Sequence, residues 1–96
     1  MISEEELIEI EKRANYAQKG PWKAYIEGRD HESGSDFIMT GFGTENENDI
    51  ELIGARKDDY DFIANARQDI PKLVAEIREL KSKLTKNTTA NNGLAQ

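Results

Sequence analysis

The chain has 96 residues, no cysteine and a formal net charge of −6, from 19 acidic and 13 basic residues. This length allows one domain with a modest core, and the lack of thiols excludes disulfides and thiolate metal sites. The negative charge argues against a protein that follows nucleic-acid backbones, where a broad basic face supplies most of the affinity. No apolar run approaches the ~20 residues that span a bilayer, and the acidic N-terminus is unlike a signal peptide. We therefore expect a soluble intracellular protein that binds neither membranes nor long nucleic acid.

The first predicted element is a helix over residues 4–19. Ser3 and Glu6 form a capping box, and the acidic first turn suits the positive end of the helix dipole. Apolar residues then recur every three or four positions, which places them on one face. The pair Gly20-Pro21 ends the helix.

A three-stranded antiparallel sheet is predicted next. Side chains alternate with a period of two in PWKAYIEG (21–28) and again in DFIMTGFG (36–43), and a third strand is expected around Ile50 to Ile53. Polar turns separate the three segments, so a meander is the simplest topology. The glycines of the second segment indicate a bulge or a close approach to the backbone.

Two further helices are predicted after the sheet. The first starts at Asp58 or Asp59 and ends near Arg67, and the second is capped by Asp69 and accepts Pro71 in its first turn. The predicted fold is therefore α+β: an N-terminal helix, a three-stranded antiparallel meander and two C-terminal helices.

One domain is expected over residues 1–86, followed by a tail over residues 87–96. The tail has almost nothing apolar to bury, which predicts disorder. The last helix carries a heptad seam, which packs in the chain's own core or joins copies of the chain, and the sequence leaves both open. The seam residues are Ile70, Leu73, Ile77, Leu80 and Leu84.

Catalytic and metal sites find little support in the sequence. The only histidine, His31, lies in the turn DHESGS beside serine and acids. Members of a catalytic triad come from separate elements and need an oxyanion hole, so a solvated polar turn is the better interpretation. The acidic cluster at 45–49 lacks the central glycine of a calcium loop, and the cluster at 58–61 lacks both that glycine and the late glutamate. We predict no catalytic residue, no metal and no cofactor.

Arginines placed singly are the candidates for a binding site. Arg29 closes the first strand, Arg56 leaves the third, and Arg67 lies where the two late helices are expected to join. Arg67 either forms a structural ion pair with Asp69 or binds a phosphate, and the sequence leaves both open. Aromatic side chains that could stack on a base are Phe37, Phe42, Tyr25 and Tyr60.

Two segments of the chain resemble a group of small phage-encoded proteins. These proteins share a leading helix that ends in a GPW-like turn, a short sheet, an F-I-A-x-A-R-x-D-I/V-P block and a leucine-rich helix. The resemblance covers roughly residues 4 to 85 and includes GPW at 20–22. The matching residues of the block are Phe62, Ile63, Ala64, Ala66, Arg67, Asp69, Ile70 and Pro71.

One type within this group is the Thoeris anti-defence sponge. Such phage proteins bind cyclic ADP-ribose isomers made by bacterial TIR enzymes and withhold them from the defence effector, and relatives hold cyclic oligonucleotides. The resemblance implies a protein of the host cytoplasm that sequesters its ligand without degrading it and is not an enzyme. It also implies a homo-oligomer, a dimer or a trimer of dimers, with ligand sites at the subunit interfaces.

The resemblance also suggests which residues bind the ligand. Arg67 would be the first phosphate contact and Arg29 the second. Phe37 or Phe42 would face the adenine, and polar roles would fall to Asn48 and Asn65.

Two other functions remain open at this point. The chain could be a phage early-region accessory protein of the same layout that binds a host protein. It could also be a small nuclease or phosphodiesterase, which is disfavoured because one turn-borne histidine and capping carboxylates form no convergent site.

Overall fold

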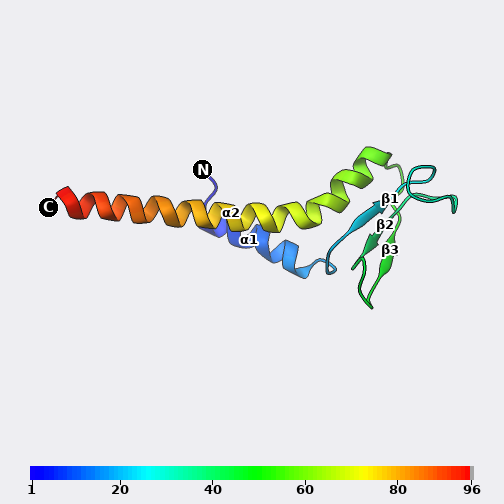
Figure 1. Ribbon diagram of the computed structural model, residues 1–96, viewed down its shortest axis with the longest axis horizontal. Coiled ribbons are helices and arrows are strands. Elements are labelled where there is room, and N and C mark those ends of the chain that lie inside the picture. Colours follow the sequence, from blue (N-terminus) through cyan, green and yellow to red (C-terminus); the bar gives the residue numbers. More distant parts are fainter. Residues whose placement is uncertain (96) are drawn as a thin grey trace.

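The computed structural model describes the backbone of residues 1–95 and the side chains of residues 1–86. Figure 1 shows a long helical rod with a shorter helix beside it and a small sheet at one end. The side chains of the tail predicted to be disordered, residues 87–96, lie outside the described residues, and that prediction stays untested. In chain order the elements are α1 (Glu4–Tyr16), β1 (Lys23–Tyr25), β2 (Phe37–Thr40), β3 (Asn48–Ile50) and α2 (Lys57–Ala95).

The predicted α+β class is confirmed, but the C-terminal part of the described chain holds one helix instead of two. The predicted break between Arg67 and Asp69 is wrong, because α2 continues through Pro71. Proline lacks an N–H and crowds the carbonyl four residues earlier, which bends a helix when packing holds both sides. The ribbon of α2 changes direction between its green and yellow parts in Figure 1.

Helix α1 begins as the sequence predicts and ends earlier. The Oγ of Ser3 accepts a hydrogen bond from the backbone N–H of Glu6 at 3.1 Å, as in the predicted cap. The helix stops at Tyr16 instead of residue 19, because Ala17 takes an extended conformation after its N–H has bonded to the carbonyl of Arg13. Residues 17–22 therefore form an extended link from α1 to the sheet.

The sheet is the predicted antiparallel meander, with strand order β1-β2-β3. Ala24 pairs with Ile38, which pairs with Ile50, and the third strand starts at Asn48, a little before the predicted position. Side chains alternate between two faces. The face toward α2 forms the core, with Ala24, Ile26, Ile38, Tyr60 and Ala64 buried together.

A tight turn after β2 requires glycine. Gly41 has a φ of +63°, and a Cβ added there would lie 2.9 Å from Oγ1 of Thr44 and 3.1 Å from the carbonyl oxygen of Asn46. This agrees with the close backbone approach expected in this segment.

Helix α1 lies antiparallel to α2 and is held by polar contacts at both ends. Arg78 of α2 forms ion pairs with Glu4 at 2.6 Å and Glu11 at 3.3 Å, and Nζ of Lys81 donates to the carbonyl of Ile2 at 2.9 Å. Leu7 of α1 is fully buried.

The other end of α1 is joined to α2 through Gln68 and Trp22. The backbone N–H of Trp22 donates to Oε1 of Gln68 at 2.7 Å, and Nε2 of Gln68 donates back to the carbonyl of Trp22 at 3.1 Å. These two segments are the GPW turn and the arginine block singled out in the sequence. Their contact fixes where the chain passes from α1 into the sheet.

We expect Gln68→Ala to lower the free energy of unfolding by about 1–3 kcal/mol, because it leaves both part-buried backbone groups of Trp22 unpaired. Urea denaturation followed by Trp22 fluorescence and far-UV circular dichroism, at one protein concentration, measures the change. Asn65→Ala is the matched control, since Asn65 is exposed on the same helix and only bonds back to the carbonyl of Asp61. Equal stability of the two variants would contradict the role of Gln68.

Candidate functional site

An open groove runs between α1 and α2, with a volume of about 560 Å³. Its walls are almost entirely apolar, with Leu7 and Ile10 on one side and Ile63 and Ile70 on the other. Two charged side chains, Arg13 of α1 and Arg67 of α2, also line it. A groove of this volume lies within the range of small-molecule sites.

Trp22 and Arg67 are held side by side by one carbonyl group. The backbone oxygen of Gln18 accepts a hydrogen bond from Nε1 of Trp22 at 3.1 Å and from Nε of Arg67 at 2.9 Å. Both side chains also line the groove. Gly20 lies against the aliphatic part of Arg67, where an added Cβ would be 3.5 Å from Cγ. The end of the groove at Trp22 and Arg67, here called the arginine end, therefore presents an indole next to a guanidinium.

The two arginines that line the groove differ from the other arginines in their ion pairing. Within residues 1–86, the other three arginines are ion-paired, Arg29 with Asp30 and Asp61, Arg56 with Asp59, and Arg78 with Glu4 and Glu11. Arg13 and Arg67 have no such carboxylate among the described side chains, so the Arg67–Asp69 ion pair, one of the two alternatives left open by the sequence, is not formed. Two of the side chains that line the groove are thus guanidinium groups without a carboxylate partner among the described side chains.

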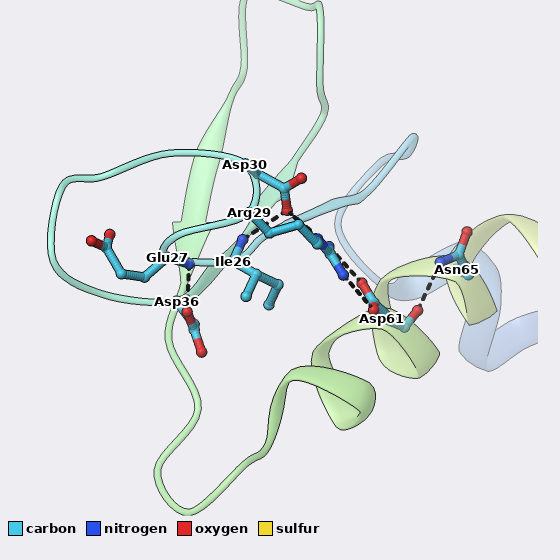
Figure 2. Close-up of polar contacts among 7 residues, drawn as sticks. All are labelled: Ile26, Glu27, Arg29, Asp30, Asp36, Asp61 and Asn65. Carbon is cyan, nitrogen blue, oxygen red and sulfur yellow. Dashed lines mark hydrogen bonds and ion pairs between the residues drawn. The ribbon is translucent and has the colours of Figure 1, made fainter.

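Arg29, expected as the second phosphate contact, is bound by carboxylates of its own chain. Its two terminal nitrogens bond to both carboxylate oxygens of Asp61 at 2.8 and 2.9 Å, and its Nε bonds to Asp30 at 3.0 Å (Figure 2). Oδ2 of Asp30 also accepts the backbone N–H of Ile26 at 2.9 Å. We therefore assign Arg29 a structural role that ties the β1–β2 loop to α2.

Phe37 and Phe42 lie on the outer face of the sheet, away from α2. The ring of Phe37 stacks on the ring of Tyr25, with 5.2 Å between the ring centroids. The centroid of the His31 ring lies 5.0 Å from that of Phe37. Nζ of Lys23 lies 4.9 Å from the centre of the Phe42 ring. Neither phenylalanine lines the groove, so one protomer does not bring the predicted stacking rings to Arg67.

The two predicted asparagines are also separated from each other. Nδ2 of Asn48 lies 3.4 Å from Oε1 of Gln18, the residue whose carbonyl holds Arg67. Asn65 is exposed on α2 and bonds back to Asp61. The sequence analysis missed Arg13, Trp22 and Gln18 as members of the site. The sequence held a signal for Arg13, because this residue adjoins Ala14, which lies on the apolar face predicted for α1.

His31 was expected in a solvated turn, and this is only partly so. Its side chain is 15% exposed, because the ring packs against Tyr25 and Phe37. Nδ1 accepts the N–H of Ser33 at 3.0 Å and lies 2.7 Å from its hydroxyl, both within the loop.

Metal-binding clusters and membrane-spanning helices are both absent from the described residues. Those residues contain no group of three or more His, Cys, Asp or Glu side chains that could hold a metal ion. Over the same part of the chain, no helix is both long and apolar enough to cross a membrane.

The ion pair between Arg29 and Asp61 predicts that the stability of the protein depends on pH. Hydrogen bonds from Arg29 lower the pKa of Asp61 below its ordinary value. A lowered folded-state pKa stabilises the fold above the unfolded value, about 3.9, and this contribution disappears as the pH falls through the folded value. Asp61→Asn should therefore reduce stability at about pH 7, and the reduction should shrink as the pH falls below about 4, as measured by urea denaturation.

Asp58→Asn is the control for this variant, because Asp58 is an exposed residue of the same helical turn. An Asp61→Asn effect that is as large at low pH as at neutral pH would show that the charge of Asp61 is not what stabilises the loop.

Comparisons of this chain with protein-family models, with curated proteins and with solved structures found no significant match. The resemblance to phage anti-defence sponges thus rests on the two sequence segments alone. The function has to be inferred from the groove, its two arginines and the indole between α1 and the sheet.

Proposed function

We propose that this protein captures a cyclic nucleotide signal of the cyclic ADP-ribose class and withholds it without degrading it. Cyclic oligonucleotides are a related class of ligand for the same site. The observation that carries the proposal is the pair Arg13 and Arg67, which lack ion-pair partners among the described side chains and line an apolar groove beside Trp22.

The chemistry of this end of the groove suits such a ligand. A pyrophosphate-bearing ring has about two negative charges, which two arginines can bind with charge-assisted hydrogen bonds. Stacking of a base on an aromatic ring adds about 1–3 kcal/mol. We assign the second phosphate contact to Arg13 instead of Arg29, because the guanidinium of Arg29 is bound by two carboxylates. We assign the stacking to Trp22 instead of Phe37 or Phe42, which lie on the other face of the sheet.

The proposal includes the setting in which capture takes place. The protein would act in the cytoplasm of a phage-infected host and would be a homo-oligomer, a dimer or a trimer of dimers joined through α2. It would not be an enzyme, since sequestration involves no bond making or breaking. A ligand site between subunits would use the groove together with the helix of a second copy.

A second candidate function is the binding of a host protein. The groove is open and apolar, and Leu73 and Leu80 on α2 are 59% and 55% exposed. Exposed apolar surface of this kind also marks protein–protein interfaces. Under this function, cyclic nucleotides would produce no thermal shift.

Ligand uptake tests the proposal directly. The protein is incubated with cyclic ADP-ribose isomers or cyclic trinucleotides, separated from free ligand and heat-denatured, and the released material is analysed by chromatography. Recovery of unaltered ligand supports sequestration. A converted product would indicate an enzyme, and no uptake would contradict both.

We expect Arg67→Gln and Arg13→Gln each to weaken ligand binding by about 10- to 100-fold, because a hydrogen bond to a charged group contributes about 1.5–3 kcal/mol. Isothermal titration calorimetry measures the change, and light scattering checks that the assembly is intact. Lys12→Gln is the matched control, since it removes the same charge next to Arg13 from a side chain that is ion-paired with Glu9. Arg29→Gln should keep its affinity. A loss of affinity in Arg29→Gln alone would place the site elsewhere.

A further inference from the structure

The two ends of the described chain differ in charge. Residues 27–61, which form most of the sheet and the start of α2, hold 11 acidic and 3 basic side chains. Residues 62–86, the following part of α2, hold 3 acidic and 6 basic side chains, and helix α1 beside them adds 5 acidic and 2 basic ones, so this end carries no net charge. The protein is elongated, 68 × 26 × 20 Å, and these two regions follow one another along its length (Figure 1).

Part of the heptad seam of α2 is exposed. Val74 faces α1 and is buried, while Leu73 beside it is 59% exposed and Leu80 is 55% exposed. The sequence left open whether this seam is core or an interface. Exposed leucines at heptad spacing are typical of a surface that pairs with another helix.

A second apolar surface lies at the acidic end, where β3 leads into α2. Ile53 is fully exposed and Phe62 is 76% exposed. They line a shallow hollow of about 430 Å³ together with Ile63 and Asp59. The hollow adjoins the groove beside α1, because Ile63 lines both, and Ile70 of the seam lines the groove.

We propose that two copies of this chain pair antiparallel along α2, about a two-fold axis near Ile70 and Leu73. This specifies the self-association in the proposed function and is independent of any ligand. In this arrangement the partner's Leu80 lies against Ile63, and the partner's Lys83 lies near Asp59. The basic part of each α2 thereby meets the acidic end of the other copy.

Charge complementarity decides the direction of pairing. A parallel pair would place the two acidic ends side by side, and like charges brought together oppose association. An antiparallel pair about a two-fold axis makes the same favourable contact twice. It also lets each seam cover the exposed side chains at the start of the other α2, which a monomer leaves in water.

The antiparallel pair also completes the candidate ligand site. The helix of the second copy passes along Ile63 and Ala66 and closes the groove beside Arg67. The arginine end of the groove then becomes a pocket between subunits. The seam of the partner subunit fills the apolar rest of the groove.

Cysteine cross-linking tests the direction, because the natural chain has no cysteine. Phe62→Cys and Lys83→Cys chains, one with a longer tag, are mixed, oxidised and separated on a non-reducing gel. We expect a disulfide between the Phe62→Cys chain and the Lys83→Cys chain. Two Lys83→Cys chains should form little disulfide with each other, since the two copies of residue 83 lie at opposite ends of an antiparallel pair.

A Lys83→Cys product without the mixed product would show a parallel pair and overturn the inference. So would the absence of the mixed disulfide in a sample that light scattering shows to be dimeric, or a wild-type protein that is monomeric. These outcomes do not depend on ligand uptake, so failure of the antiparallel pair and failure of nucleotide capture are distinguishable.

Leu73→Asp should split the dimer at concentrations where wild type is paired, because it buries a charge at the two-fold axis. Analytical ultracentrifugation measures the shift, and Lys72→Asp, on an exposed neighbouring position, is the control. A Leu73→Asp chain that keeps its helical circular dichroism and remains dimeric would overturn the proposed axis.

Discussion

The structure depends on the junction between the α1–β1 link and the middle of α2. The side-chain amide of Gln68 satisfies both backbone groups of Trp22, as a neighbouring strand would. One residue away, Arg67 shares the carbonyl of Gln18 with the indole of Trp22. The side chain of Gln18 in turn accepts a hydrogen bond from the buried hydroxyl of Thr40. Helix α1, the sheet and α2 therefore meet at a few polar contacts, and their relative positions follow from them.

This junction explains why the groove has one polar end and one apolar end. The polar contacts draw Arg67 and Trp22 together where α1 stops, while α1 and α2 continue side by side through apolar faces. Three of the five arginines in residues 1–86 neutralise acids of their own chain. The remaining two line the groove, where apolar walls strengthen their attraction for an anion. Local charge, not net charge, therefore determines which ligand a small acidic protein can hold.

Small size and elongated shape favour self-association. A chain of 96 residues buries a limited core, and much of the apolar seam of α2 stays exposed in one copy. The same helix has acidic side chains near its start and lysines further along, so in the proposed antiparallel pair a second copy would cover exposed apolar side chains and bring opposite charges together. The ligand site and the assembly would then share one helix, and binding of a ligand would be coupled to pairing.

The sequence by itself determined the elements that depend on near neighbours. The Ser3 cap, the alternation around Ala24 and Ile38, and the short polar turns each act within a few residues, so the N-terminal helix and the meander were predicted. Only the tertiary structure decided that α2 runs through Pro71, because distant contacts at Gln68 and Arg78 hold both sides of the bend. It likewise decided that Arg29 binds Asp61, 32 residues away, and that Arg13 shares a groove with Arg67. Contacts between distant residues leave no local periodicity in the sequence, and they decide which of several arginines is ion-paired within the fold.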